Sequence, residues 1–236
     1  MSKNFWLVIV AIIVVLIGIF AITSHGSNTS TNLKPTNHVE GLGKDGVKLV
    51  EWGDYQCPYC GEYYSTVKQV VAQYYNQITF QFRNFPLTSI HPNAFAGARA
   101  AEAAGLMGKY WQMHDLLYQQ NQEYYASNGS FSTWIGASNP EPFFVKDAES
   151  LGLNGTKFQQ LYSSDKVNNL VLADENVGNS LGINATPTFF LDGKQIQVAD
   201  SVSAFDKLIN AAIAQKTGKT NKTAPTSAGT TQQTKK

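Results

Sequence analysis

The stretch Val50-Glu51-Trp52-Gly53-Asp54-Tyr55-Gln56-Cys57-Pro58-Tyr59-Cys60 contains both cysteines of this 236-residue chain. It begins inside a β-prone run, Val47 to Trp52, and apolar residues recur at helical spacing after it. Proline is favoured in the first turn of a helix. We therefore predict that the cysteines lie where a strand passes through a short loop into the N-terminus of a helix.

Two cysteines at this spacing can form half of a zinc site, a structural disulfide or a redox centre. Structural zinc needs four ligands, and there is no second cysteine pair. His91 and His114 are the histidines outside the predicted linker, but they belong to a predicted helical region, so no metal is expected. A disulfide closing so short a loop constrains the unfolded chain very little. The redox interpretation uses the proline-containing spacer and the strand–loop–helix setting.

The helix end predicts different roles for the two thiols. Cys57 precedes the helix, where unpaired N–H groups and the positive end of the dipole stabilise a thiolate. We expect Cys57 to be the exposed, acidic thiol that forms the mixed disulfide with a substrate. Cys60 lies one turn inside and is expected to be its buried partner.

A charge-free apolar run, FWLVIVAIIVVLIGIFAI, occupies residues 5–22. As a helix it would be about 27 Å long, enough to cross a bilayer. The run is longer than a typical signal-peptide core and lacks a good cleavage site, although a cleaved signal is the alternative. Lys3 precedes it, so the positive-inside rule predicts a single-pass membrane protein with the rest of the chain on the extracytoplasmic side.

The central region is acidic and predicted to be mostly helical. All acidic residues lie between Glu40 and Asp206, and the absence of a basic stripe argues against a nucleic-acid partner. Alternation predicts a strand at residues 78–85, helical patterns fill residues 91–182, and a hairpin and a last helix follow. Trp111, Met113 and His114 are expected in the core. Trp134 is expected to line a groove or cover a loop.

Several motifs resemble the DsbA-like thiol–disulfide oxidoreductases, particularly their membrane-anchored forms. Besides the cysteine stretch, these motifs are Phe82-Arg83-Asn84-Phe85-Pro86-Leu87, His91-Pro92-Asn93-Ala94, Gly108-Lys109-Tyr110-Trp111 with Met113-His114-Asp115, and Gly182-Ile183-Asn184-Ala185-Thr186-Pro187-Thr188-Phe189. The resemblance implies an α/β thioredoxin fold with a helical domain inserted after the second strand. It also implies a cis peptide bond before Pro187 and substrate binding by Thr186 and Pro187.

We accordingly expect a thioredoxin fold with an inserted helical domain, preceded by one transmembrane helix. The expected organisation is an anchor at 1–22, a flexible linker at 23–38, the first part of the thioredoxin-like domain at 39–90, an inserted helical subdomain at 91–182, the second part of the thioredoxin-like domain at 183–215, and a disordered tail at 216–236.

Three further residues are expected to tune the thiols. Pro58 keeps the sulfurs close, and Tyr59 stands where a histidine is often found in the strongest oxidases of the family. Its lack of charge predicts a less oxidising disulfide. The family has an acidic residue at the position of Glu51 that is thought to move protons near the buried thiol. The alternative is that Glu51 or Asp54 points to solvent.

The expected function is a disulfide oxidoreductase that introduces disulfides into exported proteins through Cys57 and Cys60, without another cofactor. The resemblance implies a quinone-linked membrane enzyme as re-oxidant. The alternatives are an envelope reductase or isomerase, and a non-enzymatic chaperone or adaptor whose cysteines are incidental.

Overall fold

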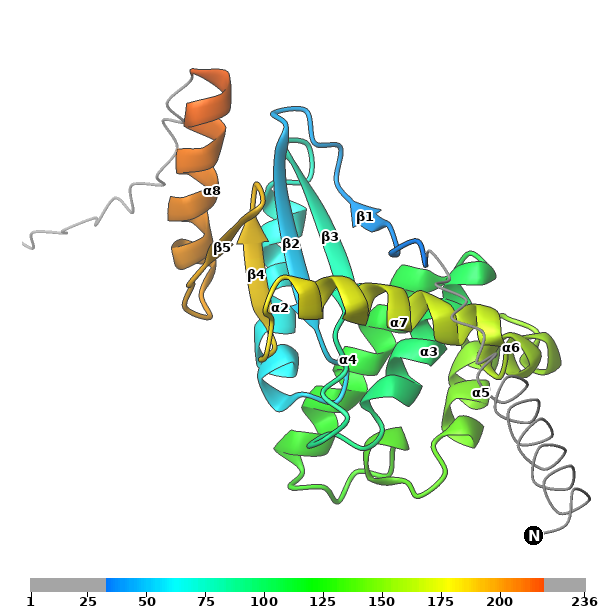
Figure 1. The fold of residues 1–236 in the computed structure, drawn as a ribbon. Coiled ribbons are helices and arrows are strands. Elements are labelled where there is room, and N and C mark those ends of the chain that lie inside the picture. The colour runs from blue at the N-terminus through cyan, green and yellow to red at the C-terminus, as the bar shows by residue number, and fades with distance from the viewer. Residues whose placement is uncertain (1–32, 219–236) are drawn as a thin grey trace, which may run out of the picture. The chain divides into compact units, whose positions relative to one another are not determined.

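The computed structural model describes residues 33–218, drawn in colour in Figure 1. The predicted membrane anchor at 1–22, most of the predicted linker and nearly all of the predicted tail lie outside this range. None of the helices between residues 33 and 218 has the length and apolar character that a bilayer crossing requires.

Five strands form one mixed sheet in the order β1-β3-β2-β4-β5. They are β1 (His38–Glu40), β2 (Val47–Gly53), β3 (Ile78–Asn84), β4 (Thr188–Leu191) and β5 (Lys194–Ile196). β2 runs parallel to β3, and the other neighbouring pairs are antiparallel. The two predicted central strands and the predicted hairpin are confirmed, whereas β1 was not predicted.

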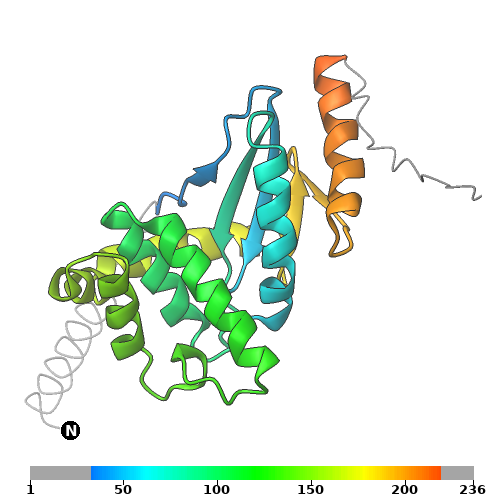
Figure 2. The same cartoon turned by 180° about the vertical axis from the view of Figure 1, so that it is seen from behind.

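Helix α2 connects β2 to β3, and a long helical segment follows β3. The helices are α2 (Pro58–Gln73), α3 (Ala94–Leu106), α4 (Tyr110–Ala126), the short 3₁₀ helix η1 (Trp134–Gly136), α5 (Glu141–Ser150), α6 (Gly155–Tyr162), α7 (Asp165–Ser180) and α8 (Val202–Thr217). The view from behind in Figure 2 shows α2 and the green helices α3 and α4 on the same side of the sheet. The helical insertion predicted between the strands is confirmed, and α8 extends two residues into the predicted tail.

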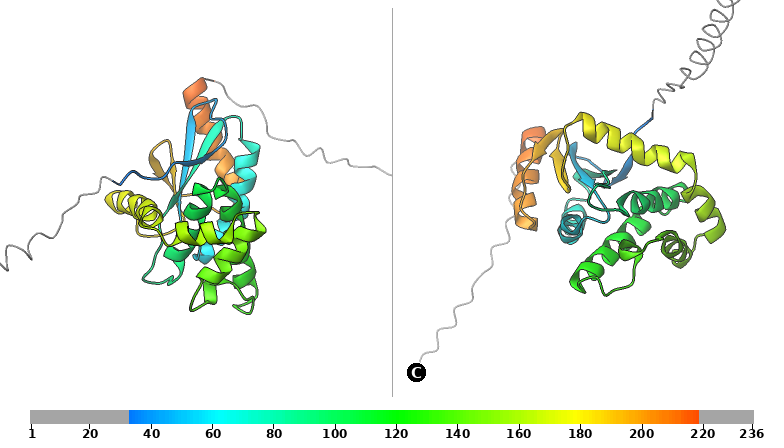
Figure 3. Two further views of the ribbon diagram at one scale, coloured as in Figure 1. Left: turned by 90° about the vertical axis from the view of Figure 1, so that its right-hand side faces the viewer. Right: turned by 60° about the horizontal axis from the view of Figure 1, so that its bottom comes forward.

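The sheet is covered on both faces, and β2 alternates between them because successive side chains of a strand point to opposite sides. Val47 and Leu49 belong to the main core, which helices α2, α3, α4 and α8 also build. Trp52 packs with Phe85 in a smaller cluster that Val177 of α7 covers. The right-hand view of Figure 3 shows α7 on one face of the sheet and α2 on the other. This register turns Glu51 toward the main core.

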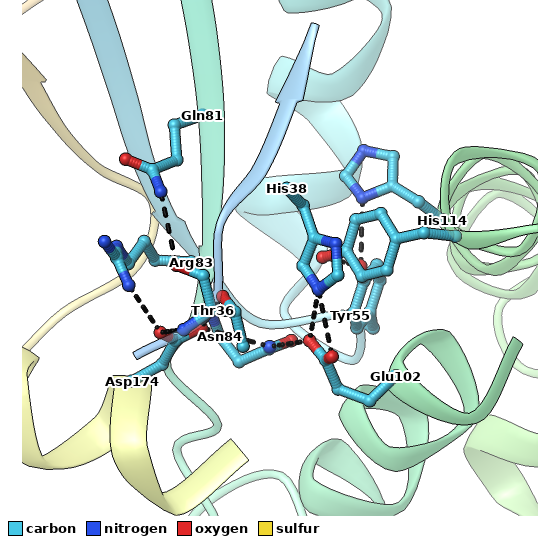
Figure 4. A network of polar contacts seen from close by, with 10 residues as sticks. Thr36, His38, Tyr55, Gln81, Arg83, Asn84, Glu102, His114 and Asp174 are labelled. Carbon is cyan, nitrogen blue, oxygen red and sulfur yellow. Dashed lines mark hydrogen bonds and ion pairs between the residues drawn. The ribbon is translucent and has the colours of Figure 1, made fainter. Parts of the chain in front are cut away.

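The last residues of the predicted linker are part of the fold, so the boundary at residue 38 was wrong. Thr36 is buried, and its N–H and hydroxyl donate to the two carboxylate oxygens of Asp174 at 2.9 and 2.5 Å. The same carboxylate pairs with Arg83 at 2.8 Å and accepts the N–H of Asn84 at 3.1 Å. Figure 4 shows these side chains meeting between β3 and α7. A buried carboxylate requires such partners, and Thr36 supplies two of them.

His114 and Trp134 are both buried, but only the burial of His114 was predicted. His114 is buried, as predicted, and burial keeps its pKa well below the usual value. Its Nδ1 atom lies 2.9 Å from the Tyr55 hydroxyl oxygen (Figure 4). Trp134 neither lines a groove nor covers a loop. It is fully buried and packs on Phe144, since the loop that carries it folds back onto α5 as a 3₁₀ turn.

Candidate active site

The cysteine motif lies at the junction that the sequence predicts. β2 ends at Gly53, and Cys57 is the residue that precedes the first turn of α2, with extended backbone angles of φ −66° and ψ 124°. Pro58 occupies the first helical position, where its missing N–H costs no helical hydrogen bond. Both cysteines are present as free thiols.

Cys57 is less accessible than expected. We predicted an exposed thiol, but Cys57 is 3% exposed and Cys60 is fully buried. The loop before β4 covers Cys57. The Cys57 Sγ–H donates to the carbonyl oxygen of Thr186 in this loop at 3.4 Å, across 129 residues of sequence. The prediction was wrong because the helix end fixes the electrostatics of this thiol, whereas a distant loop fixes its exposure.

The two thiols nevertheless differ in acidity as the helix position predicts. The hydrogen bond from Cys60 lowers the pKa of Cys57 to about 6, against the opposing effect of burial. Burial and the neighbouring Cys57 hold the pKa of Cys60 well above its usual value. Near neutral pH the pair therefore carries its thiolate on Cys57 and its proton on Cys60.

The peptide bond between Thr186 and Pro187 is cis, as the family resemblance implies. This loop borders a groove of about 230 Å³ beside the cysteine motif. The groove is lined by Tyr59, Tyr63, Thr186, Pro187, Thr188, Phe189, Gln195, Ile196, Gln197 and Val198. Tyr59 is 63% exposed at its rim, so the motif, the cis-proline loop and the β4–β5 hairpin share one surface.

Glu51 is buried and does not point to solvent. Its side chain faces a cavity of about 10 Å³ with Tyr118, Lys68 and Asp115, about the space that one water molecule needs. Its Oε1 atom has no hydrogen-bond partner among residues 33–218. Burial, and then the charge of Cys57, raises the pKa of Glu51 to about 8. The carboxyl group is thus protonated near neutral pH and able to exchange a proton beside the thiols.

Asp54 is also buried, and its side chain ties two loops together. Its Oδ1 accepts the N–H of Gln56 at 2.7 Å, and its Oδ2 accepts the N–H of Leu87 at 3.0 Å. The Nδ1 atom of His91 lies 2.7 Å from the same Oδ2. His91 was considered above as a zinc ligand; in the structure its partner is this carboxylate, while His114 pairs with Tyr55.

Helical residues that sequence reasoning missed hold the active-site loop by its backbone. The Asn121 amide donates to the carbonyl oxygens of Tyr55 and Cys57 at 2.9 and 3.1 Å, and the Tyr125 hydroxyl donates to that of Gln56 at 2.8 Å. The close approach of Asn121 requires a glycine at position 61, because a Cβ there would clash with its Oδ1. The sequence signal was a polar residue, Asn121, on the mostly apolar face of α4.

Comparison with known proteins agrees with this geometry. A family model described as thioredoxin matches residues 33–211, which is most of the chain. The chain belongs to the thioredoxin family. Both its strand–loop–helix cysteine motif and the sheet around it therefore have the family's arrangement, as the sequence motifs predicted.

Several solved structures have a fold similar to that of this thioredoxin-family member. BdbD from Bacillus subtilis, in its oxidised form, matches with a TM-score of 0.63 and 18% identity over 75% of this chain and 92% of that one. The α-DsbA1 protein of Wolbachia pipientis matches with a TM-score of 0.62 and 18% identity, over 78% of this chain and 94% of that one. A thioredoxin-like oxidoreductase from Silicibacter pomeroyi matches with a TM-score of 0.59 and 24% identity, over 75% of this chain and 91% of that one. The fold, including the helical insertion, is that of the DsbA proteins.

The curated relatives are longer. Na⁺/H⁺ antiporter NhaA 1 of Salinispora arenicola is 31% identical over 179 residues, which are 75% of this chain and 25% of the antiporter. NhaA 1 of Mycolicibacterium gilvum is 31% identical over 160 residues, which are 67% of this chain and 24% of that antiporter. The chain thus spans about a quarter of the length of these antiporters.

Proposed function

We propose that this protein is a thiol–disulfide oxidoreductase that introduces disulfide bonds into exported proteins. The observation that carries the proposal is the difference between the two thiols: an acidic Cys57 at a helix N-terminus and a buried, protonated Cys60. The thioredoxin-like oxidoreductase from Silicibacter pomeroyi, which shares the fold, supports it. Cys57 and Cys60 are the catalytic residues, and no further cofactor takes part.

The reaction starts from the Cys57–Cys60 disulfide. A substrate thiolate attacks the sulfur of Cys57, which breaks the enzyme disulfide and forms a mixed disulfide, and Cys60 takes up a proton. A second substrate thiolate then attacks the substrate sulfur of the mixed disulfide, and Cys57 leaves as a thiolate. Two electrons pass from the substrate to the enzyme. The acidity of Cys57 favours its departure and stabilises the reduced enzyme, so it drives the exchange toward substrate oxidation.

The surroundings of the thiols supply binding and proton transfer. Thr186 and Pro187 bind the substrate backbone next to Cys57, in the groove along β4 and β5. Glu51 exchanges the proton that Cys60 gains and loses, since the acid is buried and protonated near neutral pH. Pro58 and Tyr59 set the geometry and potential of the pair.

The partners follow from this direction of electron flow. Exported proteins with free thiols are the substrates, and a quinone-linked membrane enzyme re-oxidises Cys57 and Cys60. The protein is anchored by residues 5–22 with its catalytic domain on the extracytoplasmic side. No nucleic acid is involved.

The test is oxidation of a reduced two-thiol peptide by the protein carrying the Cys57–Cys60 disulfide. The wild type should form one peptide disulfide per enzyme disulfide consumed. Neither Cys57→Ser nor Cys60→Ser can form the enzyme disulfide, so both variants should be inactive. A chaperone or adaptor would retain its cellular phenotype in the Cys57→Ser/Cys60→Ser double variant, and that result would contradict the proposal.

A further inference from the structure

A contact between a buried carboxylate, Asp54, and a half-buried histidine, His91, lies next to the cysteine motif and has no part in the exchange reaction. Asp54 is 1% exposed, and the side chain of its partner His91 is 13% exposed. The Asp54 carboxylate is fixed by the N–H groups of Gln56 and Leu87 and lies 2.7 Å from His91 Nδ1. The pair therefore joins the loop before α2 to the loop after β3 in one defined geometry.

This pair is coupled to Cys57 through the backbone and through charge. The carbonyl oxygen of Asp54 accepts the N–H of Cys57 at 3.1 Å. The negative charge of Asp54 raises the pKa of Cys57, opposing the effects that lower it. The hydrogen bond to Asp54, and more weakly the charges of Asp54 and Cys57, raise the pKa of His91 against the effect of burial. The carboxylate, the imidazole and the thiol thus interact with one another.

An unpaired carboxylate here would work against the chemistry of Cys57, because like charges disfavour each other's ionised forms. Glu51, the other acidic group coupled to Cys57, avoids this conflict by holding its proton up to a pKa of about 8. Two backbone N–H groups donate to the Asp54 carboxylate oxygens and hold the side chain in place. Backbone N–H groups carry no net charge, so a side chain has to neutralise the carboxylate. His91 is the side chain in contact with it.

We propose that His91 is a positioning residue for disulfide exchange: its imidazolium neutralises Asp54 and supplies the positive charge that Tyr59 does not provide between the cysteines. The inference rests on the proposed function and deepens it. When a substrate dithiol reduces the Cys57–Cys60 disulfide, Cys60 takes one proton, the second is released, and Cys57 remains as a thiolate. His91 stabilises this reduced product and so makes the enzyme disulfide more oxidising.

The direct test compares His91→Gln, which keeps a hydrogen-bond donor without charge, with His91→Lys, which keeps the charge. The ultraviolet absorbance of the Cys57 thiolate is followed against pH, and the thiol–disulfide equilibrium is measured in glutathione buffers. We expect His91→Gln to have at least about threefold less thiolate near pH 6 and to shift the equilibrium toward the enzyme disulfide. His91→Lys should restore most of both values.

The matched control is His38→Gln, which removes a similar pair, His38–Glu102 at 2.9 Å, from another part of the domain. It should leave the thiolate titration unchanged. An equal shift in both glutamine variants would overturn the proposal, as would a lysine variant that behaves like glutamine, because either result assigns the effect to packing.

A second measurement needs no change at His91. The pKa of His91 is read by NMR in the reduced wild type and in Cys57→Ala, and it should be higher in the wild type because the thiolate attracts the imidazolium. Equal values would overturn the inference. If the wild type does not exchange with glutathione at all, the proposed function itself fails; if it exchanges but His91 is insensitive, only this inference fails.

Discussion

Asn121 Nδ2 lies 3.1 Å from the carbonyl oxygen of Cys57, so a helix of the insertion holds the residue that performs the chemistry. The same amide also binds the carbonyl of Tyr55. The inserted helices thus have a role beyond covering the sheet: they fix the backbone from which the Cys57 side chain projects. Gly61 on α2 leaves the space for this contact.

Replacing Asn121 by alanine should loosen the active-site loop. The variant loses two buried hydrogen bonds and leaves the Tyr55 carbonyl without this donor, which is expected to cost about 1–3 kcal/mol of unfolding free energy. The rate of peptide oxidation should fall more than this stability loss explains. Urea unfolding and the oxidation rate are measured together. Gln112→Ala, an exposed position on the same helix, is the control and should change neither.

Glu51 should make the protein less stable as pH rises. Its pKa is about 8 in the folded state and about 4.5 in the unfolded state, so only the unfolded state loses the proton between these values. The contribution of Glu51 to the free energy of unfolding is fully present below about pH 4.5 and is lost progressively as the pH rises to about 8. Glu51→Gln cannot ionise, so it should gain stability over the wild type by several kcal/mol between pH 5 and pH 8. Urea unfolding at both pH values checks this, and parallel pH profiles would contradict it.

Alkylation should distinguish the two thiols. Because the pKa of Cys57 is lowered to about 6 and that of Cys60 is raised, iodoacetamide should modify Cys57 alone in the folded, reduced protein. The rate should rise with pH around a midpoint near 6. Peptide mapping by mass spectrometry identifies the modified residue. Modification of both thiols at similar rates would show that the predicted difference in acidity is absent.

The segment before β1 should contribute to stability. Thr36→Val removes the hydroxyl that donates to Asp174 inside the fold, and the unfolding free energy is expected to fall by about 1–3 kcal/mol. Thr156→Val makes the same change at an exposed position and is the control. Thermal unfolding measures both variants. Equal melting temperatures would mean that the Thr36 contact carries no stability.

The sequence predicted the parts of the site that depend on local structure. The position of Cys57 before α2 follows from Pro58 and the periodicities on either side of it. The cis bond before Pro187 came from family motifs, since the dipeptide alone predicts a turn. Helical residues such as Met113 were correctly placed in the core because one face of α4 is apolar.

The contacts between distant segments were not predictable in this way. Thr186 covers Cys57, Asn121 binds its carbonyl and His91 pairs with Asp54, and each contact joins residues far apart in the sequence. Such contacts depend on how loops and helices pack against the sheet, which no local periodicity encodes. For the same reason the sequence left open whether Glu51 is buried, and it assigned Thr36 to a linker.

We propose that Cys57 and Cys60 form an oxidising redox pair. The measurement that tests it most directly is the equilibrium of this pair in buffers of reduced and oxidised glutathione, followed by the state of the two thiols. Stabilisation of the Cys57 thiolate predicts an oxidising pair, largely reduced at glutathione ratios that leave structural disulfides intact. A strongly reducing potential, with the disulfide persisting in excess reduced glutathione, would contradict the proposed oxidase and favour a reductase.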